Sequence, residues 1–143
     1  MIILSLLFID NYLFNHLQIK IMNEKKTLTI ILTEGPYRSQ YANLAYELAM
    51  SALNNEYNVN MFLYMDATHI PRRGQNPHSF PNVGHKYKKL LKKGADIRVC
   101  IRCATARGHA CDPHSPYLKG IKITTVYDIP EWVLNSDKVI SLG

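Results

Sequence analysis

Two cysteines three positions apart are the residues best suited to covalent chemistry. Cys100 and Cys103 end an apolar stretch, and a third cysteine, Cys111, follows them. A cysteine thiolate is both a nucleophile and a metal ligand, so a Cys-x-x-Cys pair indicates reactive-thiol or metal chemistry. Three cysteines within twelve residues form a poor disulfide framework. They fit functional thiols in a reducing compartment better, and we expect a cytoplasmic protein.

Three kinds of chemistry are open to this pair. One cysteine could carry a sulfane sulfur by nucleophilic chemistry, or the two could form a dithiol–disulfide switch. The switch is disfavoured because the tryptophan-glycine-proline context of thioredoxin-type motifs is absent. A zinc site is the third option, with His109, Cys111 and His114 as further donors. Their spacing matches no usual zinc finger or ribbon, so metal ranks third and no metal is expected.

Cations around the pair would favour an anionic sulfur species. Arg102 and Arg107 flank Cys103, and the small residues between them suit a helix that begins just after a strand. A helix start and nearby cations lower the pKa of a thiol from about 8.5. We therefore expect Arg102 and Arg107 to stabilise the charged sulfur of a bound substrate.

Strand-like and helix-like stretches alternate along the chain. Apolar β-branched runs predict strands, and apolar residues at helical spacing predict helices. The strands are expected at 27–33, 57–64, 96–100, 121–126 and 138–142. Helices are expected at 83–93 and 127–135, and two more are expected to end near residues 54 and 107. The alternation predicts a three-layer α/β fold, with a mainly parallel five-stranded sheet and helices on both faces.

The expected sheet places the candidate site. Ligands of open parallel sheets bind beyond the carboxyl ends of the strands, where the strand order reverses. With an assumed order of 2-1-3-4-5, the turn after the first strand lies beside the cysteines. In that turn Glu34, Gly35 and Tyr37 could orient a ligand or a partner thiol, although ordinary turn chemistry explains them about as well.

Other polar residues have simpler explanations. Asp128 is expected to cap the helix that follows it, and Trp132 is expected in the core. The loop histidines are each expected to be surface residues rather than bases. They are His69, His78, His85, His109 and His114.

Length and charge restrict the classes of function. The 143 residues suffice for one domain with its own core, and the formal net charge is +6. The lysines at 86–93 are spaced as the exposed face of a helix, and no aromatic residues alternate with arginines as on a nucleic-acid platform. The sequence has no Gly-x-Gly-x-x-Gly motif and no phosphate-binding loop. We expect no nucleic-acid partner and no cofactor.

Residues 1–21 differ from the rest of the chain. Their apolar run is far shorter than the ~20 residues that span a bilayer, and the early positive charge of a signal peptide is missing. We expect the native protein to begin at Met22, with 22–143 as a single domain and 1–21 as an extra segment from a start site placed too early. The competing interpretation is a membrane-associated or packing helix. No membrane partner is expected.

Several stretches share the pattern of one known family. They are the strand edge at 32–37, the approach at 92–100, the turn at 100–108, and the segments 127–133 and 137–140. Together they resemble the DsrE/DsrF-like family of sulfur-relay proteins, including its TusD-type subunits. The resemblance extends from about residue 27 to residue 142 and leaves out 1–21.

The resemblance implies a flavodoxin-like fold and assembly into homo-oligomers, or hetero-oligomers with related subunits. It also implies a sulfurtransferase activity, in which a cysteine accepts sulfane sulfur as a persulfide from a donor protein and passes it to an acceptor protein. The family's reactive cysteine stands eight residues before the glycine of an Arg-Gly pair, a spacing that falls here on Cys100 and Gly108. Cys103 would then resolve the persulfide or be the acceptor itself. The alternative is a non-catalytic oligomeric binding or assembly subunit, with structural or metal-binding cysteines.

Overall fold

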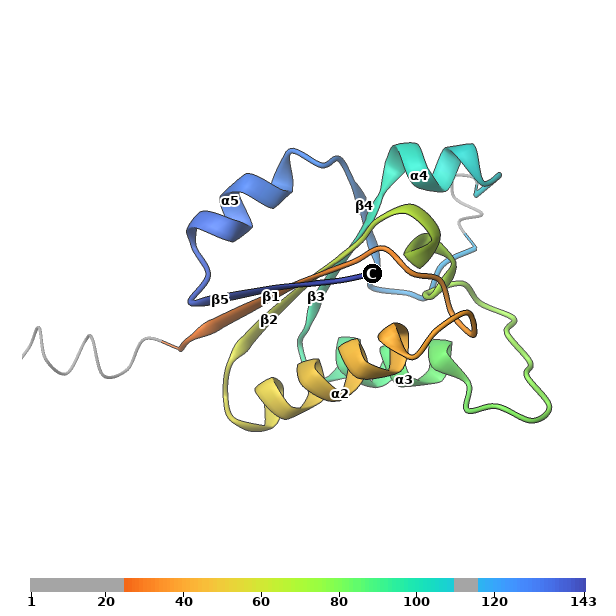
Figure 1. The fold of residues 1–143 in the computed structure, drawn as a ribbon, viewed down its shortest axis with the longest axis horizontal. Coiled ribbons are helices and arrows are strands. Elements are labelled where there is room, and N and C mark those ends of the chain that lie inside the picture. Colours follow the sequence, from red (N-terminus) through yellow and green to blue (C-terminus); the bar gives the residue numbers. More distant parts are fainter. Residues whose placement is uncertain (1–24, 110–115) are drawn as a thin grey trace, which may run out of the picture.

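A five-stranded parallel sheet forms the middle layer of the protein, whose computed structural model describes residues 25–109 and 116–143 (Figure 1). Its strands are β1 (Thr27–Leu32), β2 (Asn58–Leu63), β3 (Asp96–Cys100), β4 (Lys122–Thr124) and β5 (Lys138–Leu142). Every neighbouring pair is parallel, so all the carboxyl ends meet at one edge. The predicted sheet is confirmed, with strand ends that differ from expectation by a few residues at most.

Helices cover both faces of the sheet. On one face lie α2 (Tyr41–Asn54) and α3 (Val83–Lys92), and on the other lie α4 (Ile101–Ala106) and α5 (Asp128–Leu134) (Figure 1). A short 3₁₀ helix, η1 (Met65–His69), follows β2 and begins the segment before α3, for which the sequence predicts a loop over 66–82. The predicted three-layer architecture is therefore confirmed.

The strand order is β4-β3-β2-β1-β5, so the assumed order of 2-1-3-4-5 is wrong. β2 is the neighbour of β3, with Leu63 opposite Val99. The strand sequences could not reveal this, because β1 and β2 are both largely apolar and either could fill a central position. As a consequence, the segment after β2 lies between the turn after β1 and the cysteines.

The face of the sheet toward α2 and α3 holds the main hydrophobic core. Alternate residues of β1, β2 and β3 point into it and are almost fully buried. From α2 the core receives Ala42, Ala45 and Ala49. Helical spacing predicts an inward face made of Tyr41, Leu44, Ala45, Leu48, Ala49 and Ala52. The last four lie in the core or pack against it, whereas Tyr41 and Leu44 are more than 40% exposed. The small alanine side chains let the helix approach the sheet closely, and this approach decides which face turns inward.

Two expectations concern residues outside the described ranges. The extra segment 1–21 is one, and the loop with Cys111 and His114 is the other. Within residues 25–109 and 116–143, no helix has the length and apolar character that a membrane span requires.

Truncation of Leu32, which is completely buried in the interior strand β1, should destabilise the fold. We expect Leu32→Ala to lower the free energy of unfolding by about 2–5 kcal/mol, through lost burial and the remaining cavity. Leu134, which is 84% exposed on α5, provides the matched control. Leu134→Ala should change the free energy of unfolding by less than about 0.5 kcal/mol. Urea unfolding measures both. Equal losses in the two variants would show that β1 is not at the centre of the core.

Candidate functional site

The two cysteines lie together where β3 passes directly into α4. Cys100 ends the strand and Cys103 lies in the first turn of the helix. Cys100 is 1% exposed and belongs to a small cluster with Phe62 and Trp132. Cys103 packs against the same cluster but keeps part of its surface exposed. Both are free thiols in contact with each other, and Cys103 is the one that solvent reaches.

The surroundings of Cys103 disfavour its thiolate. Burial raises the pKa of the Cys103 thiol, and its contact with Cys100 raises it further. A hydrogen bond with the Met65 backbone and the charge of Arg107 act in the opposite direction without cancelling this effect. The expected lowering of the thiol pKa is therefore wrong for Cys103, because desolvation outweighs the field of one guanidinium.

A carboxylate that was not expected at the site holds Arg107. The Nε and Nη2 atoms of Arg107 donate to Asp66 Oδ1 at 2.8 and 2.6 Å, and Nη1 donates to the Cys103 carbonyl oxygen at 3.1 Å. The hydrogen bond from Arg107 lowers the pKa of Asp66. Arg107 thus fastens α4 to η1, and Asp66 offsets much of the positive charge that the thiols would otherwise feel.

A row of alternating charges joins the segments after β1, β2 and β3. Arg38 lies between two carboxylates, with Nη1 3.6 Å from Asp66 Oδ2 and Nε 3.3 Å from Glu34 Oε2. Gly35 is buried beside them, and a Cβ atom at that position would lie 3.2 Å from the Asp66 carbonyl oxygen. The predicted residues Glu34 and Gly35 therefore reach the cysteine region through Asp66. Asp66 could have been noticed, because it follows a strand at the edge where ligands bind.

The other two predicted residues have different surroundings. Arg102 is exposed on α4 and is not among the groups that shift the pKa of Cys103. Tyr37 has a φ angle of 68°, and its hydroxyl donates to Gln75 Oε1 at 2.8 Å. The Tyr37 side chain therefore contacts the segment beyond η1.

Two histidines that were expected at the surface, His69 and His109, pack together at the end of η1. His109 is 2% exposed, its ring centroid lies 4.6 Å from that of His69, and its Nδ1 atom lies 2.6 Å from the Tyr117 hydroxyl. Burial lowers the pKa of His109 to about 4, and His69, Arg72 and Arg107 contribute to the decrease. The surface prediction for His109 is wrong, because its ring packs against those of His69 and Tyr117. His78 and His85 are exposed as predicted.

Metal binding was the third chemistry considered for the cysteines. In residues 25–109 and 116–143, no group of three or more His, Cys, Asp and Glu side chains is arranged to hold a metal ion. A zinc site would therefore require Cys111 or His114, which lie outside those ranges.

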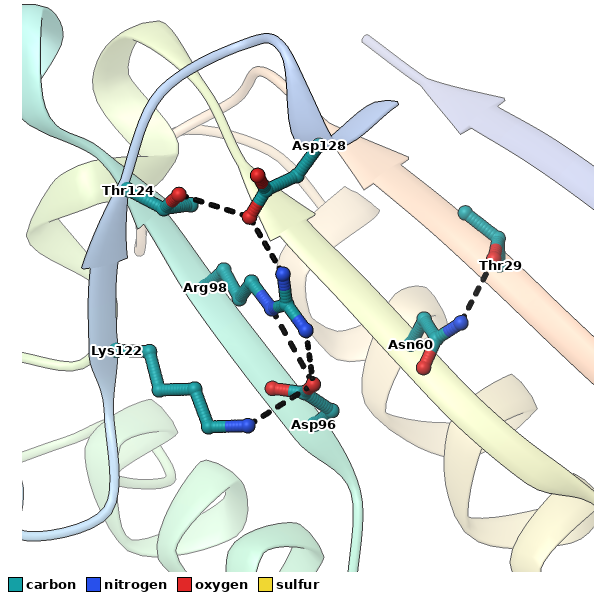
Figure 2. A network of polar contacts seen from close by, with 7 residues as sticks. All are labelled: Thr29, Asn60, Asp96, Arg98, Lys122, Thr124 and Asp128. Carbon is teal, nitrogen blue, oxygen red and sulfur yellow. Dashed lines mark hydrogen bonds and ion pairs between the residues drawn. The ribbon is translucent and has the colours of Figure 1, made fainter. Parts of the chain in front are cut away.

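A network around Arg98 fastens the strand that ends in Cys100. The Nε and Nη2 atoms of Arg98 donate to Asp96 Oδ2 at 3.2 and 2.7 Å, and Nη1 donates to Asp128 Oδ2 at 2.5 Å (Figure 2). The guanidinium lies 4.3 Å from the ring centroid of Trp132, close enough for a cation–π interaction. Arg98 therefore joins β3 to α5 on the face that holds the thiols.

The same two carboxylates bind the edge strand β4. Lys122 Nζ donates to Asp96 Oδ2 at 3.1 Å, and Thr124 Oγ1 donates to Asp128 Oδ2 at 2.7 Å (Figure 2). Because β4 has only three residues, these side-chain contacts add to a short backbone pairing. β3, β4 and α5 are thus held by one set of charges.

Asp128 was expected to cap α5, and that prediction is wrong. The N-cap of α5 is Tyr127, and Asp128 is the first helical residue. Hydrogen bonds from Arg98 and Thr124 lower the pKa of Asp128. Its carboxylate turns toward the sheet because a cation and a hydroxyl there offer stronger partners than the backbone of the first turn.

The chain matches known proteins over most of its length. The DsrE/DsrF-like family matches residues 26–142. The uncharacterised protein MJ0989 of Methanocaldococcus jannaschii is 33% identical over 113 residues, 79% of this chain and 96% of that protein. The uncharacterised protein MK0008 of Methanopyrus kandleri is 31% identical over 113 residues, 79% of this chain and 91% of that protein. Protein YchN of Escherichia coli is 27% identical over 116 residues, 80% of this chain and 97% of that protein.

Solved structures show the same fold. The crystal structure of the Escherichia coli YchN protein aligns with a TM-score of 0.74 and 25% identity, covering 83% of this chain and 100% of that one. BT1422 of Bacteroides thetaiotaomicron, described as a conserved protein of unknown function, aligns with a TM-score of 0.61 and 19% identity, over 82% and 95% of the two chains. The second likeness concerns the fold alone.

Replacement of Arg98 should destabilise the protein in a pH-dependent way. We expect Arg98→Met to lower the free energy of unfolding by about 1–3 kcal/mol near pH 7, because Asp96 and Asp128 lose a charged hydrogen-bond donor. Both carboxylates have pKa values lowered below 3.8, so this stabilisation is complete above that value and disappears as the pH falls through the folded-state pKa values. Urea unfolding of wild type and variant, near pH 7 and below pH 3.8, measures the difference.

Arg102→Met serves as the control, because Arg102 is exposed on α4. Its effect should stay within about 0.5 kcal/mol at either pH. An Arg98→Met deficit that did not shrink in acid would contradict the role assigned to the two carboxylates.

The pH dependence of alkylation should report the environment of Cys103. We expect the rate of Cys103 modification by iodoacetamide to rise with a midpoint above that of an ordinary thiol, about 8.5, because the pKa of Cys103 is raised. Arg107→Gln should move the midpoint higher, since the guanidinium favours the thiolate, whereas Arg102→Gln should move it less. Peptide fragmentation locates the modified residue. A midpoint below the ordinary thiol value of about 8.5, or equal shifts in the two variants, would contradict this description.

Proposed function

Because the chain belongs to the DsrE/DsrF-like family, we propose that it is a sulfur carrier, accepting sulfane sulfur as a persulfide on the Cys100–Cys103 pair and passing it to a partner thiol. The observation that carries this proposal is the contact of two free thiols at the carboxyl edge of a parallel sheet, one of them open to solvent. This is the edge at which ligands of such sheets bind. Sulfurtransferase activity and donor and acceptor proteins follow from the proposal.

Cys103 is the residue we assign to meet the donor. Its thiolate attacks the outer sulfur of a donor persulfide, a new S–S bond forms, and the donor leaves as a thiolate with the electron pair of the broken bond. No oxidant is needed, since one S–S bond replaces another. This assignment reverses the one based on the spacing to Gly108, because Cys100 is too deeply buried for a partner to approach it.

The buried thiol has a separate part in the proposal. Cys100 can attack the inner sulfur of the Cys103 persulfide, which closes the disulfide and releases hydrosulfide. Transfer to an acceptor instead requires the acceptor thiolate to attack the outer sulfur. Arg107 is the cation that acts on Cys103, and it would favour the anionic persulfide in the same way that it favours the thiolate.

A non-catalytic assembly subunit is the second candidate function. It is favoured by apolar side chains exposed on α5 and β5, where Tyr127 and Leu134 are 80% and 84% exposed and Val133 and Val139 are about 40% exposed. Exposed apolar surface of this kind marks protein contacts. Copies of this chain, or related subunits, would associate through it, and the cysteines would then be structural or would bind metal.

Sulfur loading of cysteine variants separates these functions. After treatment with glutathione persulfide, intact-mass measurement should show a gain of one sulfur, followed by a net loss of two hydrogens where Cys100 closes the disulfide, in the wild type and in Cys111→Ser, the control. Cys103→Ser should lose most of the loading, and Cys100→Ser should load but fail to convert the persulfide to a disulfide. A double variant, Cys100→Ser with Cys103→Ser, that loads like wild type would refute the carrier function. Loading that depended on Cys100 and not on Cys103 would refute the assignment of the attacking thiol.

A further inference from the structure

A pocket lies beyond the end of η1, between that helix and the turn after β1. Its lining includes Tyr37, His69, Arg72, Arg73 and Gln75. Since η1 rises by about 2 Å per residue, His69 lies about 8 Å along the helix from Met65, whose backbone contacts Cys103. The pocket is therefore separate from the thiols, although it opens at the same edge of the sheet.

Hydrogen bonds hold the backbone of the pocket in one shape. Gln75 Nε2 donates to the carbonyl oxygens of Ile70 at 2.6 Å and Arg72 at 3.0 Å, and Gln75 Oε1 accepts from the Tyr37 hydroxyl. The Gln75 carbonyl oxygen accepts from Asn82 Nδ2 at 2.7 Å. One glutamine thus joins both walls of the pocket.

The segment that carries the two arginines is also tied to a distant part of the chain. The Arg73 N–H donates to the Pro116 carbonyl oxygen at 2.7 Å, the Leu118 N–H donates to the Pro71 carbonyl oxygen at 2.9 Å, and Arg72 forms an antiparallel bridge with Tyr117. The exposed side chains of Arg72 and Arg73 therefore start from a fixed backbone. Such a fixed backbone lowers the entropy cost of holding a ligand.

Among the described residues that line the pocket, Arg72 and Arg73 are charged, and both are cations. In the described part of the chain Arg72 forms no ion pair, and Asp66, the carboxylate that acts on His69, is engaged by Arg107. Burial, Arg72 and Arg107 lower the pKa of His69, and the opposing influence of Asp66 does not restore it. A site that disfavours one more positive charge would gain from an anion.

We propose that this pocket binds a small, doubly charged oxyanion of the sulfate type, with Arg72 as its main donor and His69 at its inner end. A guanidinium presents a planar fork of N–H donors that matches two oxygens of such an anion. The His69 side chain adds a ring N–H. The site is independent of the proposed sulfur chemistry, because it uses neither cysteine.

Titration with sodium sulfate at constant ionic strength, against sodium chloride, tests the site. The ring resonances of His69, identified by their loss in His69→Gln, should shift with saturation in proton NMR. The His69 pKa should rise on binding, because the anion offsets Arg72 and Arg107; the other ionisable groups that act on this ring are Asp66 and His109. Absence of a saturable shift would overturn the proposal.

Charge-matched variants identify the donor. Arg72→Gln should weaken sulfate binding by about tenfold or more, the effect of removing a hydrogen bond to a charged group. Lys88→Gln removes the same charge from the exposed face of α3 and should bind like wild type. Equal sulfate affinities in these two variants would overturn the proposal. It would also be overturned if the wild-type protein bound an oligoglutamate peptide but did not bind sulfate.

The proposed anion site and the proposed sulfur-carrier function can be refuted independently of each other. The double variant Cys100→Ser, Cys103→Ser should bind sulfate with unchanged affinity. Loss of binding in that variant would overturn the separation of the pocket from the thiols, whereas loss of sulfur loading concerns the carrier alone.

Discussion

The half of the molecule that carries the cysteines depends on the charge of Arg98. Its guanidinium binds Asp96 on its own strand and Asp128 on α5, and the same carboxylates bind Lys122 and Thr124 on β4. β4 is short and lies at the edge, so its backbone pairing alone gives it little support. An ion pair that is only partly exposed keeps more of its strength than a surface pair, because water screens it less.

The site combines accessible and protected sulfur within one helical turn. Cys103 is open enough to react but is held mainly as a thiol, since burial raises its pKa. Cys100 is shielded by Phe62 and Trp132. Asp66 reduces the electrostatic effect of Arg107 on the thiols, and the contact between the two side chains docks α4 on η1. The two thiols are well positioned for reaction, but their surroundings do not favour the thiolate of Cys103. Reaction at Cys103 would therefore rely on a bound partner to favour the charged form.

Elements with a strong local pattern were predictable, and those governed by close packing were not. In α3, buried Val83, Tyr87 and Leu90 alternate with exposed lysines, so the helix and its inward face follow from spacing alone. In α2 the buried residues are mostly alanines, whose small area gives a weak signal, and the expected inward face wrongly included the exposed Tyr41 and Leu44. The strand order was also misassigned, because β1 and β2 are both apolar and their sequences do not indicate which of them lies beside β3.

The sequence by itself determined that two thiols stand where a strand becomes a helix, because Cys100 and Cys103 are close in the chain and share one turn. It also determined the α/β alternation that sends this turn to an edge of the sheet. Only the tertiary structure decided what surrounds the thiols. Arg107 meets Asp66 across 41 positions, and Arg98 meets Asp128 across 30. Local propensity covers a few residues at a time, whereas such pairs form only after the strands have taken their order and the helices have closed over them.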